Sequence, residues 1–289
     1  MNDLDEKLAF FKENGYVVLE NIFTEAQMQA WKDGYEGMVS RQLTFGGVKG
    51  WLRHLTEAEP RLMLPAVANP NILDFAEKVM GPFVQLDNLT FMGFPSVSKE
   101  EAEGKASGWH RDRYGWLPEG PQYIKPPACN AIAYMQDLTD EYGPLRVVPG
   151  SHRSNVVPSD DDRQKPHTDE KIIHVKAGDV VFTHCCVLHS GTPNYSGKLR
   201  YFFSIYYNLS YMKTTDNHNG PNITAIIGNA EKRDDRRTKR LFGVDNQVEM
   251  RVNSGFAKHD EVIWEEWIEE DRVVLKEPLD LDELIPGAS

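Results

Sequence analysis

The spacing of apolar residues predicts a helix at the start of the chain. Leu4, Leu8 and Phe11 recur at helical intervals, and Gly15 can end this helix in a left-handed conformation. The apolar run YVVL at residues 16–19 then predicts a short strand. We therefore expect the chain to open with a helix followed by a strand.

Two further helices are predicted before residue 83. Thr24 and Gln27 form a possible capping box ahead of apolar residues at near-helical spacing, which are Met28, Trp31, Tyr35 and Met38. Another helix is expected from residue 69, because Pro70 suits a first helical turn and Gly81 a helix end. Residues 1–82 are therefore predicted to form a mainly helical support.

At Phe83 the pattern changes to short runs rich in β-branched and aromatic residues, separated by Pro, Gly, Asn and Asp. The runs are FVQLDNLTFMGF, ACNAIAYMQDL, PLRVVPGS, KIIHVKAGDVVFTHCCVLHSG and LRYFFSIYYNLS. Successive short strands favour a jelly roll, and helices ahead of strands favour an α+β fold with the helices packed on one sheet. We expect a single domain over residues 1–289, with a jelly-roll core at 83–208 and a C-terminal extension at 209–289.

Composition and charge limit the classes of function. Hydrophobic residues make up 40% of the chain and charged residues 26%, as in a soluble globular protein, and the net charge of −12 argues against a general nucleic-acid surface. No apolar run approaches the roughly 20 residues that span a bilayer, and the acidic N-terminus lacks the basic region of a signal peptide. We expect a cytoplasmic protein without nucleic-acid or membrane partners, whose basic run Glu231–Arg240 forms a solvated helix face.

Candidate chemistry lies in the sequence GWHRDRY at residues 108–114. If this stretch is extended, His110 and Asp112 point to one side and Arg111 to the other. The pair alone is a weak signal, since His-x-Asp is common by chance. A kinase-like catalytic loop is excluded, because Leu117 stands where that loop needs Asn and the sequence holds no DFG.

A second histidine and an arginine follow later in the chain. His189 comes after an apolar strand, and Arg200 opens the next strand. On a strand beside His110 and Asp112, His189 would complete the ligand set of non-haem Fe(II) oxygenases. That triad leaves positions open for a 2-oxo acid and O2, and Arg200 would bind the far carboxylate of the acid.

The residues His184, Cys185 and Cys186 close to His189 could instead suggest a zinc site. Strand alternation would place Cys185 and His189 on one face and the other two on the opposite face. One four-ligand cluster is therefore disfavoured, and the cysteines are expected to be small core residues.

Four segments, in order, resemble the phytanoyl-CoA dioxygenase family of Fe(II)/2-oxoglutarate-dependent oxygenases. They are FKENGYVVLENIFTEAQM, HRDRYGW, YMQDLTDEYGPLRVVPGSHR and GDVVFTHCCVLHSGTPN, and Arg200 follows His189 by eleven residues, as in the family. The resemblance covers roughly residues 8 to 208. Within the third segment, Tyr142 stands where Asn is common.

The resemblance implies a double-stranded β-helix core with iron held by His110, Asp112 and His189. It also implies 2-oxoglutarate bound to the iron and to Arg200, with O2 as the other cosubstrate. Gly191 departs from the family, because Ser or Thr commonly stands there and helps the arginine hold the carboxylate. The missing hydroxyl is expected to come from Ser190, Thr192 or Thr183.

Further contacts are predicted around this site. Gln85, Asn88 and Thr90 lie on the strand before His110, and one or two of them are expected to contact 2-oxoglutarate, because polar side chains inside a barrel are costly unless bonded. Asn130, which opens a later strand, is expected to reach 2-oxoglutarate as well. The proline-rich loop after the iron ligands is expected to supply the substrate contacts, which are Tyr114, Trp116 and Arg113.

The predicted function is an Fe(II)- and 2-oxoglutarate-dependent dioxygenase. It would hydroxylate a C–H bond of a small, polar or anionic molecule and release succinate and CO2. Asp112 favours hydroxylation, because related halogenases carry a small residue in place of this carboxylate. Two alternatives remain: a non-catalytic jelly-roll protein that binds 2-oxoglutarate or metal, and a cupin-like metalloenzyme that uses no 2-oxo acid. The sequence leaves the oligomeric state open.

Overall fold

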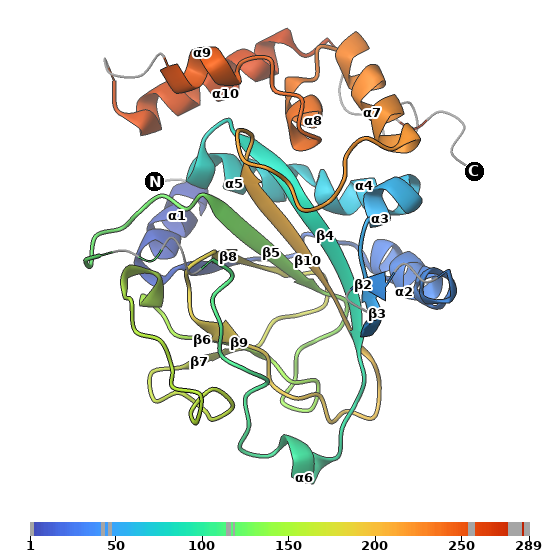
Figure 1. Cartoon of the computed structure of the whole chain (residues 1–289), viewed down its shortest axis with the longest axis vertical. Helices are drawn as coiled ribbons and strands as arrows, with labels where there is room; N and C mark the ends of the chain where they lie inside the picture. The colour runs from blue at the N-terminus through green and yellow to red at the C-terminus, as the bar shows by residue number, and fades with distance from the viewer. Residues whose placement is uncertain are drawn as a thin grey trace. The chain divides into compact units, whose positions relative to one another are not determined.

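The computed structural model describes residues 3–41, 44–45, 48–113, 117, 119–253, 258–276 and 285. The chain forms two compact units: unit 1 comprises residues 1–51 and 91–204, and unit 2 comprises residues 52–90 and 205–289. Strands β4 (Val84–Phe94) and β10 (Arg200–Leu209) run from one unit into the other (Figure 1). The single domain expected from the sequence stays a prediction.

Unit 1 opens with the predicted helix and strand. Helix α1 (Asp3–Asn14) ends at Gly15, whose φ of 78° lies in the left-handed region that favours glycine. Strand β1 (Tyr16–Leu19) follows directly. The ring of Phe11 lies 5.8 Å from that of Phe182 on strand β8 (Val180–His184). Because β1 and β8 belong to the same seven-stranded sheet, α1 packs on this sheet, as predicted.

Helix α2 (Glu25–Ser40) also confirms the sequence pattern. The Thr24 N–H donates to Gln27 Oε1 at 2.9 Å, and the Gln27 N–H donates to Thr24 Oγ1 at 3.3 Å, which completes the capping box. The apolar face predicted for this helix is buried. Its Trp31 ring lies 4.8 Å from that of Phe203, so α2 packs on the same sheet as α1.

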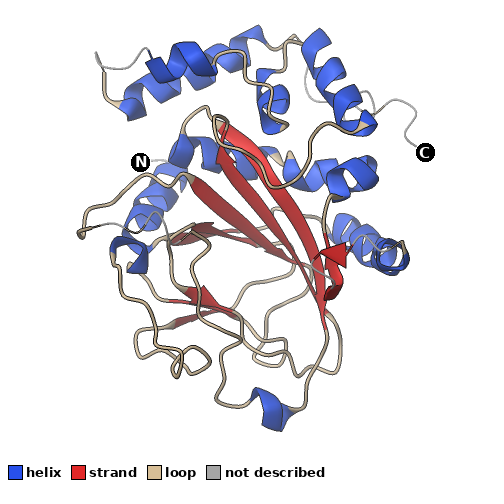
Figure 2. Cartoon of the chain, in the orientation of Figure 1, coloured by secondary structure: helices blue, strands red, loops and turns tan. Residues whose placement is uncertain are grey.

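The described strands, including the parts of β4 and β10 that belong to unit 2, form two sheets (Figure 2). The seven-stranded sheet has the order β1-β8-β5-β10-β4-β3-β2, and the three-stranded sheet has the order β7-β6-β9. Strand pairs β1–β8, β5–β8, β6–β7 and β6–β9 are antiparallel. The remaining elements of this unit are β2 (Thr44–Phe45), β3 (Val48–Leu52), α6 (Lys99–Ala102), β5 (Ala128–Tyr134), β6 (Leu145–Val147), η2 (Ser151–Arg153), β7 (Lys171–Ile173), β8 (Val180–His184) and β9 (His189–Ser190).

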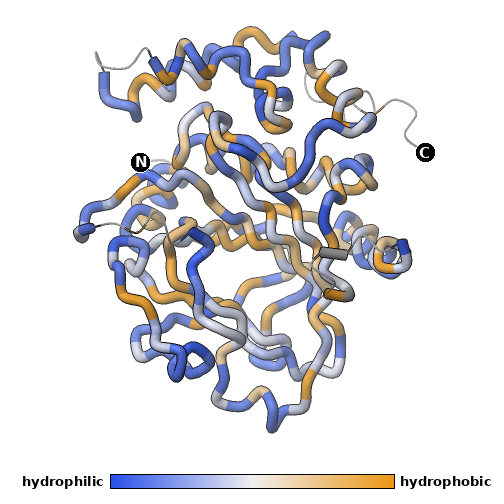
Figure 3. The backbone as a smooth tube through the Cα atoms, in the orientation of Figure 1, coloured by the Kyte–Doolittle hydropathy of each residue, from blue (hydrophilic) through white to orange (hydrophobic). Residues whose placement is uncertain are grey.

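The two sheets share a buried apolar cluster. Ile132 and Val181 come from the larger sheet, and Leu145, Val147 and Ile173 from the smaller one. Figure 3 shows hydrophobic stretches along the strands, whereas the long loop between β6 and β7 is mainly hydrophilic. Burying each of these side chains stabilises the fold by about 1.5–3 kcal/mol. The layered α+β arrangement agrees with the predicted fold class.

Unit 2 supplies helices before β4 and after β10. The predicted helix at Asn69 is α5 (Pro70–Met80), where Asn69 Oδ1 accepts from the Asn71 N–H at 3.0 Å and Gly81 ends the helix. None of the described helices is both long and apolar enough to cross a membrane. The compartment stays a prediction. The other helices are α3 (Leu55–Ala58), α4 (Pro60–Val67), α7 (Pro221–Lys232), α8 (Arg236–Leu241), α9 (Val248–Asn253) and α10 (Asp260–Val274).

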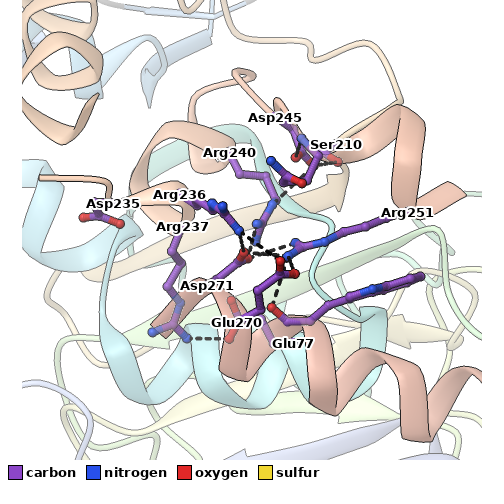
Figure 4. Close-up of polar contacts among 12 residues, drawn as sticks. Glu77, Ser210, Asp235, Arg236, Arg237, Arg240, Asp245, Arg251, Glu270 and Asp271 are labelled. Atoms are coloured by element: carbon purple, nitrogen blue, oxygen red, sulfur yellow. Dashed lines mark hydrogen bonds and ion pairs between the residues drawn. The ribbon is translucent and has the colours of Figure 1, made fainter. Parts of the chain in front are cut away.

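The basic run Glu231–Arg240 is not the solvated face that its composition suggested. Arg240 is only 1% exposed and donates to the carboxylate of Asp271, which also accepts from Arg251 at 2.6 Å (Figure 4). Burial alone would raise the pKa of Asp271, but the two guanidinium groups hold it below its usual value. The prediction was wrong because Arg236 and Arg240 pair with Asp271 on α10, and Arg237 pairs with carboxylates on α5, all of them outside the run.

Candidate active site

His110 and His189 are paired through their backbones. Each donates its N–H to the carbonyl of the other, both at 3.0 Å, in an antiparallel bridge. His189 opens β9, and His110 lies on the extended segment beside it. The two imidazole rings lie 4.3 Å apart. Backbone pairing thus brings these two side chains together.

Asp112 completes the group of three. Its Oδ1 lies 3.9 Å from Nε2 of His110 and 3.8 Å from Nε2 of His189, and the three ligand atoms lie within 4.8 Å of one another. These distances exceed a hydrogen bond but allow one ion to bridge the groups. Asp112 Oδ2 is buried and has no hydrogen-bond partner among the described residues. An unpaired buried carboxylate oxygen is costly, and a cation would satisfy it.

Both imidazoles present Nε2 towards the carboxylate. Nδ1 of His110 lies 2.9 Å from the Gly108 carbonyl, and Nδ1 of His189 lies 3.0 Å from the Val187 carbonyl. A carbonyl only accepts, so Nδ1 carries the proton and the Nε2 lone pair is left for a metal. The charge of His189 and burial lower the pKa of His110 to about 4, so His110 is neutral at pH 7. Two imidazoles and a carboxylate fit Fe(II) by ligand type.

Arg200, at the start of β10, is a buried cation with a free edge. Its Nη1 donates to the carbonyls of Thr192 at 2.7 Å, Tyr142 at 3.0 Å and Gly143. Its Nε has no hydrogen-bond partner, and no carboxylate among the described residues forms an ion pair with it. Burial lowers the pKa of Arg200, but a guanidinium stays charged at neutral pH. A buried guanidinium without a counter-ion is suited to an incoming anion.

The three hydroxyls expected to assist Arg200 already bond within the protein. Ser190 Oγ accepts from the Gly108 N–H at 3.0 Å and donates to the Gly191 carbonyl at 2.9 Å. Thr192 Oγ1 accepts from Arg146 Nε at 2.7 Å. Thr183 Oγ1 donates to the Asn130 carbonyl at 3.3 Å.

The side chains of Asn130, Gln85 and Thr90, which were expected to contact 2-oxoglutarate, differ in the hydrogen bonds that they already make within the protein. Asn130 lies on β5, where its Oδ1 accepts from Ser204 Oγ at 2.9 Å. Gln85 belongs to unit 2, and its amide donates to the carbonyls of Met212 at 2.6 Å and Leu209 at 3.1 Å. Thr90 Oγ1 lies 3.5 Å from Oδ1 of Asn88 in the same unit. Contact of Asn130, Gln85 or Thr90 with 2-oxoglutarate stays a prediction.

Residues expected to meet the substrate are described only in part. Tyr114 and Trp116 lie outside the described residues. Arg113 donates its backbone N–H to the Cys185 carbonyl at 3.1 Å, which ties this segment to the end of β8. Arg111 donates to the carbonyls of Ser151 at 2.6 Å and Val156 at 2.7 Å, so its guanidinium is used by the loop between β6 and β7.

Nothing in the sequence indicated that Arg163 lies beside the segment of His110. The Trp109 N–H donates to its carbonyl at 2.9 Å, which places Arg163 next to the segment that carries His110. Its charge acts with the larger effects of His189 and burial to lower the pKa of His110. The side chain is exposed. No local pattern marks it, because its place depends on how the loop between β6 and β7 folds back.

The alternative group His184, Cys185 and Cys186 does have its possible ligand atoms within 4.8 Å of one another. The expected strand alternation is wrong here, because β8 ends at His184 and the chain turns at the two cysteines. Nδ1 of His184 accepts from the Cys186 N–H at 3.0 Å, and Nε2 lies 3.1 Å from the Ile124 carbonyl. Both ring nitrogens are thus used, which disfavours a metal site.

Comparison with known proteins gives a consistent picture. The model of the family described as Phytanoyl-CoA dioxygenase (PhyH) matches residues 11–202. L-proline trans-4-hydroxylase from Streptomyces griseoviridis is 25% identical over 240 residues, which cover 71% of this chain and 86% of that protein. EctD from S. alaskensis with bound Fe aligns with a TM-score of 0.57 and 20% identity, over 75% of this chain and 79% of that chain. HygX from Streptomyces hygroscopicus, with nickel and 2-oxoglutarate bound, aligns with a TM-score of 0.59 and 15% identity, over 74% of this chain and 89% of that chain.

These alignments confirm the fold class. The antiparallel sheets and packed helices match structures of double-stranded β-helix enzymes. Fe is bound in one of the EctD structures, and 2-oxoglutarate in another. The residues matched by the family model include the segments that carry His110, Asp112, His189 and Arg200.

Proposed function

This chain belongs to the phytanoyl-CoA dioxygenase family of Fe(II)/2-oxoglutarate-dependent oxygenases, and on this premise we propose that it hydroxylates a C–H bond of a small, polar or anionic molecule. Enzymes of this family act on small-molecule substrates. The observation that carries the proposal is the position of Asp112, whose Oδ1 lies 3.8 and 3.9 Å from the two Nε2 atoms while its Oδ2 is buried and unpaired among the described residues.

In this proposal His110, Asp112 and His189 hold the iron, and Arg200 holds the far carboxylate of 2-oxoglutarate. When bound, iron and 2-oxoglutarate supply the oxidising chemistry, with O2 consumed and succinate and CO2 released. The Gly108 and Val187 carbonyls keep the protons of the two imidazoles on Nδ1, so Nε2 stays available as a ligand.

The side chains of the triad differ in exposure. His189 is 5% exposed and Asp112 17%, whereas His110 is 43% exposed. The buried pair excludes water from one side of the site, and the exposed edge of His110 is where the substrate would approach. A carboxylate at Asp112, rather than a small residue, favours hydroxylation, because it leaves no ligand position for a halide.

Two observations support a polar or anionic substrate. Arg163, whose side chain is exposed, accepts through its carbonyl from the N–H of Trp109, the residue before His110, at 2.9 Å. One relative of the chain is an L-proline trans-4-hydroxylase, whose substrate is a small amino acid. A guanidinium on a segment beside the site could bind a carboxylate of the substrate through charge-assisted hydrogen bonds.

The test is to incubate the full chain with Fe(II), 2-oxoglutarate, O2 and a panel of small amino and carboxylic acids that includes L-proline. We expect succinate to form and one substrate to gain one oxygen atom, measured by mass spectrometry. Binding of 2-oxoglutarate without its consumption across the panel would favour a non-catalytic binding protein. Failure of the metal-loaded chain to bind 2-oxoglutarate would favour a cupin-like metalloenzyme.

A further inference from the structure

We infer that Ser107 supplies the hydroxyl that, together with Arg200, binds the far carboxylate of 2-oxoglutarate. The inference rests on the proposed function. It assigns a binding role to a residue outside both the His-x-Asp motif and the strand of His189. Its starting point is the bare Cα of Gly191, which lies between the two side chains.

Ser107 is fixed against the strand that carries His189. Its N–H donates to the Gly191 carbonyl at 2.9 Å. A Cβ placed on Gly191 would lie 3.4 Å from Ser107 Oγ and 3.5 Å from Arg200 Nη2. The space over Gly191 is therefore bordered by a hydroxyl on one side and a guanidinium on the other.

The free donors of Arg200 lie on the edge formed by Nε and Nη2. Nη1 is occupied by the carbonyls of Tyr142, Gly143 and Thr192. Nε is buried, and neither Nε nor Nη2 donates to a described residue. This edge is the one that binds a carboxylate with two parallel hydrogen bonds. Such a carboxylate still has lone pairs for a third donor.

Ser107 Oγ is available as that third donor. It makes no hydrogen bond within the described part of the chain, and the residue is exposed. Ser190 and Thr183 already donate their hydroxyl protons to carbonyls, whereas the Thr192 hydroxyl oxygen accepts from Arg146 Nε. Gly191 itself offers no hydroxyl. Ser107 can therefore deliver from a neighbouring segment the group that a serine at position 191 would deliver directly.

The test is calorimetric titration of 2-oxoglutarate into the Mn(II)-loaded full chain without O2, so that binding is measured apart from turnover. A hydrogen bond to a charged group is worth enough to weaken binding about tenfold when it is removed, so S107A should raise the Kd about tenfold. S40A, which removes an exposed hydroxyl from α2, should leave the Kd unchanged.

The double variant S107A/G191S distinguishes the loss of a direct hydrogen bond to 2-oxoglutarate from a structural disturbance of the site. Gly191 has no positive φ, and its added Cβ makes only ordinary contacts, so a serine fits. We expect the double variant to regain most of the lost affinity while the affinity for Mn(II) stays constant throughout. Equal Kd values for the wild type and S107A would overturn the inference, as would a loss that G191S does not restore. If the wild type binds Mn(II) but not 2-oxoglutarate, the proposed function fails and this inference fails with it.

Discussion

His110 and His189 exchange two backbone hydrogen bonds of 3.0 Å, and this pairing holds their Nε2 atoms 3.9 and 3.8 Å from Asp112 Oδ1. The ligand geometry is thus built into strand pairing and into the two Nδ1 contacts with carbonyls. A site organised in this way needs little rearrangement to accept an ion, which favours tight binding.

Arg200→Gln should abolish tight binding of 2-oxoglutarate while leaving the metal site intact. Removing one partner of a buried charge pair costs about 3–5 kcal/mol, which corresponds to a Kd raised at least about a hundredfold. Calorimetric titration of the Mn(II)-loaded variant measures this change. Arg200→Lys keeps the charge but not the planar fork, so an intermediate Kd is expected. An unchanged Kd in the glutamine variant would remove Arg200 from the site.

Gly143→Ala should also weaken 2-oxoglutarate binding, through Arg200. A Cβ on Gly143 would lie 2.6 Å from Arg200 Nη1 and 2.3 Å from the Thr192 carbonyl, so the guanidinium must move. We expect the Kd to rise about tenfold or more, since 1.4 kcal/mol already corresponds to a factor of ten. Gly197→Ala is the matched control, because its φ of 76° is close to the 75° of Gly143 but its Cβ meets nothing within 4 Å. Equal Kd values in the two variants would contradict the positioning of Arg200 by Gly143.

Asp271→Asn should strongly destabilise unit 2. The carboxylate accepts from Arg240 and Arg251, both nearly inaccessible to solvent. Its loss removes the anion that the two cations share, although Arg240 keeps Asp245 at 3.3 Å and Arg251 keeps Glu270 at 3.2 Å. We expect the free energy of unfolding to fall by about 3–5 kcal/mol, measured by urea denaturation. Asp234→Asn serves as the control, because its exposed ion pair with Lys276 is screened by solvent and should contribute little to stability. A small effect at Asp271 would mean that the network is dispensable.

His152 predicts a pH dependence of stability. Burial, followed by the charge of His184, lowers its pKa to about 3, against 6.5 in an unfolded chain. Below pH 6.5 the unfolded state binds a proton that the folded state does not, so stability falls as the pH decreases from 6.5 towards 3. At pH 5 this loss amounts to about 2 kcal/mol. Urea unfolding of the wild type and His152→Gln at pH 7 and pH 5 tests it, and the variant should lose this part of the pH dependence. The same dependence in both proteins would assign it to other groups.

Local sequence patterns predicted several helix boundaries and the common orientation of His110 and Asp112. The capping box at Thr24 and Gln27 and the N-cap at Asn69 act within four positions, so the sequence alone predicts where these helices begin. That His110 and Asp112 point to one side was predicted for the same reason, because alternation along an extended segment is a local rule. The alternation expected for Cys185 and Cys186 failed because the chain turns there instead of continuing the strand. Such a turn is set by packing against neighbouring segments, which the local sequence does not show.

Other features depend on which distant segments pair. Ser107 meets Gly191 through one long-range backbone hydrogen bond, and Arg163 reaches the His110 segment through another. Arg240 is buried because Asp271 on α10 neutralises it. Neither composition nor periodicity encodes these pairings, so a surface-like basic run turned out to be part of a buried network.

The most direct test of the central claim is the amount of succinate formed from Fe(II), 2-oxoglutarate and O2 by the wild type, Asp112→Ala and Asp161→Ala, with the iron content of each protein measured in parallel. Asp161 is an exposed aspartate on the loop between β6 and β7, which makes it a control for the loss of one negative charge. We predict that Asp112→Ala loses both iron and succinate formation, whereas Asp161→Ala retains both. If Asp112→Ala binds iron and forms succinate at the wild-type rate, Asp112 is not an iron ligand and the assignment of this site is wrong.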